Sequence, residues 1–342
     1  MILLGLLIIA VGAFCQSSCY VPINRIKSWS WESYWLVQGI FAWLLFPFLG
    51  ALLAVPQGHS LCELFTADNS FRIWMTILFG ALWGVGGLTF GLSMRYLGVA
   101  LGQSIALGTC AGLGTVLGPV MLNIFFPEGH YLAQLTAAVL IGVVVTLIGI
   151  GIIGAAGSMK SRTMSEEQKR EAVKDFNFPK GIAIALLAGV MSGCFNVGLE
   201  FGGNISFSES NPMYATLPAT FLVTLGGFIT NAVYCLYQNS RNHTFADYGR
   251  TSLYANNLLY CALAGALWYS QFFGLSLGKG FLTDSPTLLA FSWCILMALN
   301  VVFSNVWGII LKEWKGCSRS TMAVLTAGII VLIISSFLPQ LI

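Results

Sequence analysis

The chain has 342 residues, of which 57% are hydrophobic and only 8% are charged, and its formal net charge is +3. A soluble domain carries about 25% charged residues, so this composition excludes a water-soluble globular protein and indicates a protein embedded in a bilayer. The nine cysteines include no CxxC pair, and the three histidines fall in separate expected loops. This distribution indicates neither a disulfide framework nor a metal site.

Apolar runs separated by polar residues, Gly or Pro predict an all-α membrane protein with ten transmembrane helices. The first run has no basic residues before it and is followed by many similar runs, so we interpret it as a span rather than a signal peptide. The expected spans cover 2–23, 32–54, 72–93, 97–124, 132–155, 180–202, 213–237, 253–277, 287–310 and 321–340.

The hydrophilic segment 157–179 divides these spans into two groups of five, 1–156 and 180–342, and we expect it to be a cytoplasmic connector. Loops rich in Lys and Arg stay in the cytoplasm. Of the sixteen basic residues, only Arg72 and Lys279 fall outside the loops that follow odd-numbered spans. The sequence therefore predicts that both termini face outward.

Two short sequence motifs each occur twice, and the two copies are separated by the same number of residues. GALW occurs at 80–83 and 265–268, and AVL occurs at 138–140 and 323–325, both with an offset of 185 positions. Each word falls on equivalent spans of the two halves, which favours an internal duplication. Because each half has an odd number of spans, the halves would insert in opposite orientations, an arrangement typical of secondary transporters with a site near the midplane.

The polar side chains expected within the spans are mainly amides and aromatic rings, whereas no Lys, Arg or carboxylate is expected at mid-span. Amides offer paired donors and acceptors for hydroxyl groups, and Trp or Tyr offers a platform for the C–H face of a sugar. A neutral polyol fits this set better than a phosphorylated ligand or a lipophilic cation. The alternative role of any one amide is to join neighbouring helices. The predicted substrate-binding residues are Trp83, Trp268, Tyr269, Gln271, Gln16, Asn231 and Asn300.

Proton coupling requires a titratable group, and ionisable residues at membrane depth are functional candidates. Glu32 begins the second span, where Arg25 or Lys27 could pair with it, and Glu200 lies near the end of the sixth. We expect both glutamates to be proton-coupling residues; the alternative for Glu32 is a charge that favours the helix dipole. An intramembrane enzyme would need a catalytic group at this depth, and no mid-span His or Asp is expected.

Several longer motifs resemble the L-rhamnose–proton symporter family, a branch of the drug/metabolite transporter superfamily. They occur in the family's order along the chain: IKSWSWESYW at 26–35, GALWGVGGLTFGLSMRYLG at 80–98, NPMYATLP at 211–218, ALWYSQFF at 266–273 and GIILKEW at 308–314. The resemblance implies two inverted five-helix repeats, an inner-membrane location in bacteria and proton-driven uptake of L-rhamnose or a similar 6-deoxy sugar.

The likeness includes Glu32 but not the polar residues Asn196, Glu200, Asn300 and Asn305, which depart from the family's pattern. The alternative of another small neutral metabolite, coupled to sodium or exported, therefore stays open at this point. The expected partners are the sugar, protons and the lipid bilayer, with no cofactor and no nucleic acid. The sequence indicates no oligomeric state.

Overall fold

The computed structural model describes residues 1–97, 99–163, 177–249, 251–312 and 314–341. Ten helices in these ranges are long and apolar enough to span a membrane, which confirms the expected number. The fifth span begins later than predicted, because residues Tyr131–Gln134 form a separate 3-10 turn before the helix starts at Ala137. That helix continues to Thr163, and residues 164–176 of the expected connector lie outside the described ranges.

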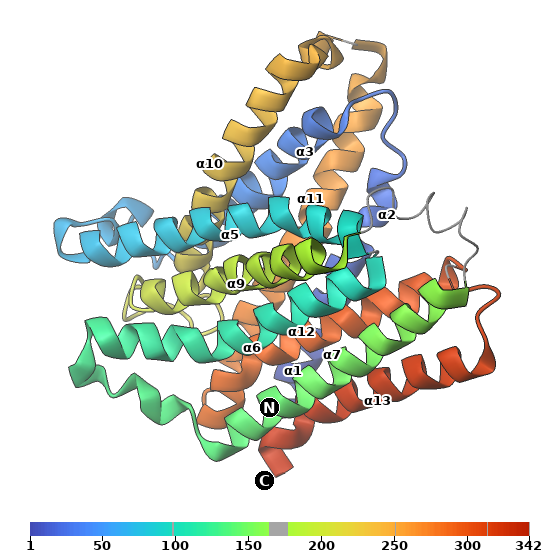
Figure 1. Ribbon diagram of the computed structural model, residues 1–342. Helices are drawn as coiled ribbons and strands as arrows, with labels where there is room; N and C mark the ends of the chain where they lie inside the picture. Colours follow the sequence, from blue (N-terminus) through green and yellow to red (C-terminus); the bar gives the residue numbers. More distant parts are fainter. Residues whose placement is uncertain (98, 164–176, 250, 313, 342) are drawn as a thin grey trace. The chain divides into compact units, whose positions relative to one another are not determined.

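The helices follow the apolar runs, as expected for backbones that must satisfy their own hydrogen bonds in lipid. The spans are α1 with α2 (Ile2–Ser18, Tyr20–Ile23), α3 with η1 and α4 (Trp31–Gly39, Ile40–Leu45, Phe46–Leu52), α5 (Ser70–Leu97), α6 (Val99–Phe125), α7 (Ala137–Thr163), α9 (Phe178–Gly202), α10 (Leu217–Asn242), α11 (Thr251–Gly280), α12 (Pro286–Ile310) and α13 (Arg319–Leu341) (Figure 1).

The chain forms two compact units, and each unit draws on both halves of the sequence. The first unit comprises Met1–Gly84 and Gly198–Phe281, and the second comprises Val85–Val197 and Leu282–Ile342. The helices α5 and α9 each pass from one unit into the other. Spans 1, 2, 7 and 8 therefore belong to the first unit, and spans 4, 5, 9 and 10 belong to the second.

The second span is not a regular α-helix. Its middle segment η1, Ile40–Leu45, is a π-helix of six residues. Pro47 follows directly, at the start of α4. A proline has no N–H to donate, and its ring presses on the carbonyl four residues earlier, here that of Trp43. The wider π turn accommodates this proline. Such turns are rare in proteins, and those that occur are often found at functional sites.

Close helix pairs in each of the two units depend on glycine. The antiparallel helices α1 and α11 place Gly12 against Gln271 and Gly5 against Gly278. In the second unit, α7 and α13 are also antiparallel, with Gly149 against Leu332. Small residues at such crossings let two backbones approach, which is the usual way in which transmembrane helices associate.

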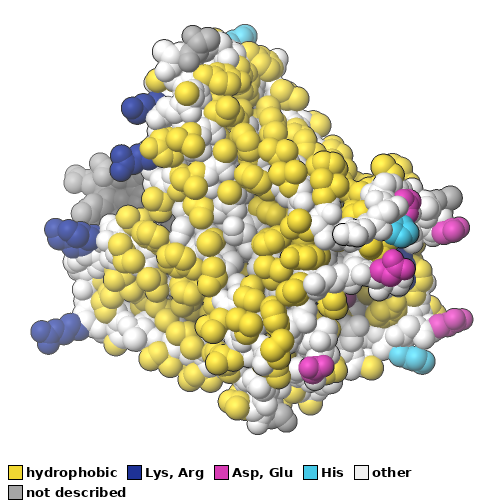
Figure 2. Space-filling model, turned by 180° about the vertical axis from the view of Figure 1, so that it is seen from behind, with side chains coloured by type: hydrophobic (Ala, Val, Ile, Leu, Met, Phe, Trp, Pro, Cys, Tyr) yellow, Lys and Arg dark blue, Asp and Glu magenta, His cyan; other side chains and the backbone are white. Residues whose placement is uncertain are grey.

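Hydrophobic side chains are spread over much of the face shown in Figure 2, while the charged side chains gather near its edges. Leu3, Val11, Trp74, Ile124 and Val233 are each more than 60% exposed. A soluble protein would not present so much continuous apolar surface to water. These side chains form a surface suited to lipid, in agreement with the ten apolar helices.

The loop between the second and third spans contains an exposed ion pair. His59 Nδ1 lies 2.6 Å from Glu63 Oε2, and His59 Nε2 lies 3.8 Å from Glu209 Oε2. The hydrogen bond to Glu63 raises the pKa of His59, and the same bond lowers the pKa of Glu63. The contribution of His59 is thus full below its unfolded pKa, near 6.5, and is lost as pH rises through the raised value.

Glu63 contributes to the stability of the loop in a different pH range. Its contribution is full above the ordinary carboxyl pKa and is lost as pH falls through the lowered value. We therefore expect hydrogen-exchange protection in the loop to be higher at about pH 6 than at about pH 9, after correction for intrinsic exchange. His59→Gln should remove this difference, whereas the exposed His130→Gln should retain it. An unchanged difference in His59→Gln would contradict the assignment.

Candidate functional site

The two copies of the GALW word bring their tryptophans together. Trp83 of α5 and Trp268 of α11 have ring centroids 5.5 Å apart, with their planes inclined by 34°. Trp43 of η1 makes edge contacts with both rings, with each pair of centroids 5.9 Å apart. Three indole rings from spans 2, 3 and 8 thus meet within the first unit. We call Trp43, Trp83 and Trp268 the tryptophan cluster.

The glycine of each GALW word permits the approach that places its tryptophan. A Cβ atom at Gly80 would overlap the backbone of α10 at Val223. A Cβ at Gly265 would overlap η1 at Phe41. The ring of Trp83 in turn lies directly on Gly227 of α10. The glycine of each GALW motif therefore permits a close helix contact: span 3 packs on span 7, and span 8 packs on span 2.

The aromatic contacts continue from the cluster toward the start of the second span. Trp35 lies 5.5 Å from Trp43, and Trp31 stacks on Trp35 at 5.4 Å with an angle of 20°. Trp31 is 41% exposed, as expected for a residue at the membrane interface. Trp35 instead points inward, and its indole nitrogen donates a hydrogen bond to Asn231 Oδ1 at 3.0 Å.

Asn231 lies next to the cluster, but its amide is engaged by the protein. Besides accepting from Trp35, it donates to the carbonyl oxygens of Gly227 at 2.9 Å and Gly84 at 3.5 Å. These contacts join α10 to α3 and α5. The arrangement favours a positioning role for Asn231, and direct contact with a ligand stays a prediction.

Three further predicted ligand residues lie on α1 and α11. The register of these helices places Gln16 at the level of Trp268. Gln271 is buried, and its side chain donates to the Trp268 carbonyl at 3.2 Å. Tyr269 is also buried, and its hydroxyl, which lies against Gly50, finds no hydrogen-bond partner among the described residues. The buried Oε1 of Gln16 also has no hydrogen-bond partner among the described residues.

Asn300 belongs to a different compact unit from the other predicted substrate-binding residues. It is buried on α12 in the second unit, whereas the other predicted substrate-binding residues lie in the first. Another amide of the second unit, Asn196, donates to the Gly114 carbonyl at 2.8 Å and so connects α9 to α6. A role of Asn300 in substrate binding remains a prediction.

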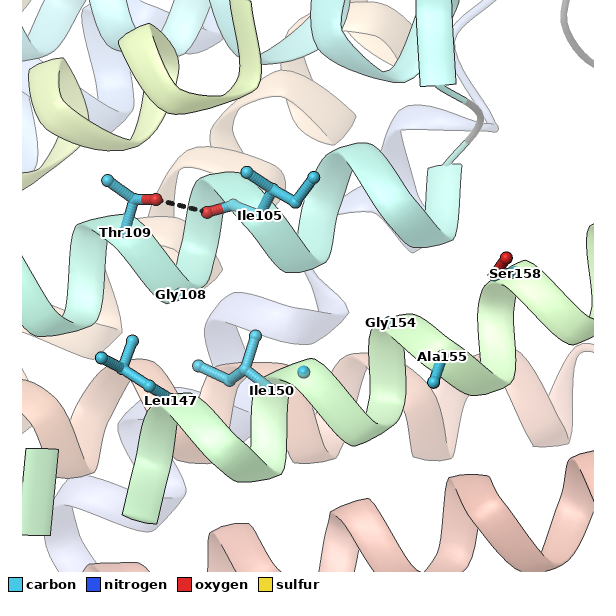
Figure 3. A pocket seen from close by; sticks show the side chains of 9 residues that line it. Ile105, Gly108, Thr109, Leu147, Ile150, Gly154, Ala155 and Ser158 are labelled. Atoms are coloured by element: carbon cyan, nitrogen blue, oxygen red, sulfur yellow. Dashed lines mark hydrogen bonds between the residues drawn. The ribbon is translucent and has the colours of Figure 1, made fainter. Parts of the chain in front are cut away.

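The hollow between α6 and α7 is unsuited to a sugar. It has a volume of about 310 Å³ and is lined mainly by small and aliphatic residues (Figure 3). Its lining side chains carry two hydroxyl groups, those of Thr109 and Ser158, and Thr109 already donates to the Ile105 carbonyl at 2.7 Å. A polyol needs several convergent donors and acceptors. This hollow does not supply them.

Glu32 is buried at the start of α3, with 6% of its surface exposed. Its Oε1 accepts hydrogen bonds from Asn242 Nδ2 at 3.0 Å and from Thr244 Oγ1 at 2.8 Å. Both partners are neutral, and the ion pair considered with Arg25 or Lys27 is not seen in the described part of the chain. Burial favours the neutral carboxyl, whereas the two donors favour the carboxylate. The ionisation state therefore depends on how α3 packs against α10.

A second buried carboxylate, Asp247, belongs to the same hydrogen-bond network. Its Oδ2 accepts from Ser30 Oγ at 2.8 Å and from Ser33 Oγ at 3.0 Å. Asn239 Nδ2 donates both to Ser33 Oγ and to Thr244 Oγ1, the residue that donates to Glu32. A continuous chain of hydrogen bonds thus joins Asp247 to Glu32.

Asp247 was not among the predicted site residues because it lies between two spans, in the 3-10 turn Thr244–Gly249. The available signal was its position directly after the polar end of α10, QNSRNHTFAD. Glu200, the other predicted proton-coupling residue, is half-buried near the end of α9. Its role stays a prediction.

Comparison with known proteins agrees with the resemblance inferred from the motifs. The family model for the L-rhamnose-proton symport protein (RhaT) matches residues 1–341. The L-rhamnose-proton symporters of Klebsiella pneumoniae subsp. pneumoniae and Salmonella gallinarum are each 32% identical over 338 residues, covering 95% of this chain and 94% of the relative. That of Salmonella typhi is 32% identical over 342 residues, with the same coverage. The chain belongs to the L-rhamnose-proton symport protein family.

Proposed function

We propose that this protein is a secondary active transporter that imports L-rhamnose together with protons. The observation that carries the proposal is the family match along residues 1–341, with relatives named L-rhamnose-proton symporters that match over nearly their whole length. The ten apolar helices supply the membrane-embedded body that such transport requires. The amide and aromatic side chains of the first unit supply the chemistry for a neutral sugar.

The sugar binds at the tryptophan cluster. Trp83 and Trp268 are half-buried rings in mutual contact and offer faces for the C–H surface of the sugar. Gln16, Tyr269 and Gln271 lie on the adjoining helices α1 and α11 and offer donors and acceptors for hydroxyl groups. Asn231 holds Trp35 and α5 in place beside them.

Glu32 carries the transported proton. It is a buried carboxyl on the same span as Trp43, and its partners Asn242 and Thr244 lie on and just after α10, which also carries Gly227 beneath Trp83. A change at the tryptophan cluster that moves α10 therefore alters the hydrogen bonds of Glu32. Glu200 is a second titratable candidate at membrane depth.

The halves 1–156 and 180–342 form inverted repeats, joined by the connector 157–179. Two observations support this arrangement. The first unit contains the equivalent spans 2 and 7, and the second contains the equivalent pairs 4 with 9 and 5 with 10. The two GALW motifs also make equivalent contacts, span 3 with span 7 and span 8 with span 2. Transport then proceeds by alternating access around a site near the midplane.

The protein lies in the bacterial inner membrane with both termini outside and the connector in the cytoplasm. Fourteen of its sixteen Lys and Arg residues fall in the loops assigned to the cytoplasm. A cysteine introduced at either terminus should react with a membrane-impermeant thiol reagent in intact cells. Reaction only after the membrane has been opened would reverse the orientation.

The function is tested by uptake of labelled L-rhamnose into proteoliposomes that contain the purified protein. With an inward proton gradient we expect accumulation that a proton ionophore abolishes, and competition by unlabelled L-rhamnose that L-mannose, which carries the additional 6-hydroxyl, reproduces poorly. Failure to take up L-rhamnose by protein that is folded and inserted would refute the proposal.

A further inference from the structure

Trp43 occupies an unusual place in the second span. It lies in the π-helical segment Ile40–Leu45, and only 3% of its surface is exposed. The π turn accommodates Pro47, and turns of this kind are frequently found at functional sites. Trp43 was not among the predicted site residues, because an apolar residue in the middle of an apolar run gives no signal by itself.

The indole N–H of Trp43 is buried and finds no acceptor among the described residues. An indole has this single polar group, and it can only donate. Two other tryptophans in the spans show the ordinary solution: Trp35 donates to Asn231 at 3.0 Å, and Trp293 donates to the Cys110 carbonyl at 3.4 Å. A buried donor without an acceptor is costly, so its retention requires an explanation.

The orientation of the Trp43 ring is defined by Gly39. The ring atoms Cε3 and Cζ3 lie against Gly39, where a Cβ atom would come within 2.7 Å of both. These atoms are on the opposite side of the indole from Nε1. The N–H edge of Trp43 therefore faces away from Gly39 and its own helix. The ring stands nearly perpendicular to both Trp83 and Trp268, at 88° and 82°.

Two further residues of the first unit, one on span 2 and one on span 8, carry buried polar atoms without partners among the described residues. Gln38, on α3, has a buried side-chain oxygen without a partner among the described residues, and Tyr269 of α11 has a buried hydroxyl in the same condition. These donors and acceptors are not paired with one another. A ligand with several hydroxyl groups, each both donor and acceptor, is the chemistry that could satisfy them.

We propose that the indole N–H of Trp43 donates a hydrogen bond to one hydroxyl of the transported sugar, while Trp83 and Trp268 contact its C–H surface. The inference rests on the proposed function and adds a specificity-determining residue to it. A site with a buried donor for one hydroxyl rejects analogues that lack this hydroxyl, because the donor is then left unpaired.

The test is exchange of labelled L-rhamnose in proteoliposomes with equal pH on both sides, which measures the sugar site without a driving force. Trp43→Phe keeps an aromatic ring but removes the donor. It should raise the half-saturating concentration about tenfold, since a neutral hydrogen bond is lost. The matched control is Trp74→Phe, the same change at a side chain that is 69% exposed, and it should leave exchange unchanged.

Singly deoxygenated L-rhamnose analogues then identify the partner hydroxyl. The wild-type protein should bind one analogue much more weakly than L-rhamnose, and Trp43→Phe should lose this discrimination for that analogue only, as a double-mutant cycle requires. If Trp43→Phe does not fold, site-specific replacement of Trp43 by benzothienylalanine, in which sulfur replaces the N–H, preserves the ring shape and gives the same comparison.

Wild-type half-saturation in Trp43→Phe would overturn the inference and would indicate an N–H that rests on a neighbouring ring face. An equal loss for every analogue would also overturn it, because that pattern indicates a packing role. In either case exchange by the wild-type protein would leave the proposed function standing. Absence of exchange in the wild-type protein would instead refute the proposed function, and the role of Trp43 with it.

Discussion

Glu32→Gln is expected to abolish uphill accumulation of L-rhamnose while preserving exchange at equal pH. The glutamine retains the oxygen that accepts hydrogen bonds from Asn242 and Thr244, but it cannot bind and release a proton. One inward proton at about 100 mV supplies about 2.3 kcal/mol, which corresponds to roughly fifty-fold accumulation. This accumulation should fall to the level of the external concentration, as measured by uptake of labelled sugar under a proton gradient.

The matched control is Glu128→Gln, which removes a carboxylate at an exposed position in the loop before α7. It should accumulate sugar like the wild-type protein. If Glu32 serves only the dipole at the start of α3, its replacement will lower the thermal stability slightly and leave accumulation intact. Full uphill transport by Glu32→Gln would thus refute its role in coupling.

Loss of either large ring of the tryptophan cluster is expected to weaken sugar binding strongly. Trp268→Leu and Trp83→Leu keep an apolar side chain but remove the flat face that we propose contacts the sugar. Each should raise the half-saturating concentration for exchange by roughly thirty-fold, which corresponds to about 2 kcal/mol. Because the two residues occupy equivalent places in the proposed repeats, we expect effects of similar size.

Trp74→Leu controls for the loss of a tryptophan as such, because Trp74 is largely exposed on the same helix as Trp83. Thermal unfolding of each purified variant separates a loss of binding from a loss of folding. Exchange with wild-type half-saturation in both cluster variants would place the sugar elsewhere in the molecule. An effect confined to one of them would argue against equivalent roles for the two halves.

The fold could largely be predicted from the sequence because the bilayer imposes a strong and simple constraint. A backbone in lipid must satisfy its hydrogen bonds internally, so each long apolar run becomes a helix. The division into two compact units could not be predicted. It depends on which helices approach each other, and residues such as Gly80 and Gly265 show their purpose only when their contacts are known.

The candidate site could be predicted in part. The repeated word led to Trp83 and Trp268, which do contact each other, but it gave no information about Trp43, whose position depends on the π turn before Pro47. The sequence also could not distinguish polar side chains that the protein engages from those that it leaves without partners. Asn231 is held by three protein groups, whereas Tyr269 and Gln16 retain buried atoms without partners among the described residues.

The network around Glu32 shows a second limit. Asp247 is distant from Glu32 in sequence and lies between spans, yet Ser33, Asn239 and Thr244 connect the two carboxylates through hydrogen bonds. Side-chain networks of this kind arise from tertiary packing, and periodicity and hydropathy contain no information about them.

The most direct test of the account measures proton movement driven by the sugar alone. Proteoliposomes with equal pH on both sides and a trapped pH-sensitive dye would receive L-rhamnose outside, with the membrane potential clamped at zero. We expect the interior to acidify on addition of L-rhamnose in the wild-type protein and to remain unchanged in Glu32→Gln, although both take up the sugar. Sugar entry without acidification in the wild-type protein would contradict proton symport.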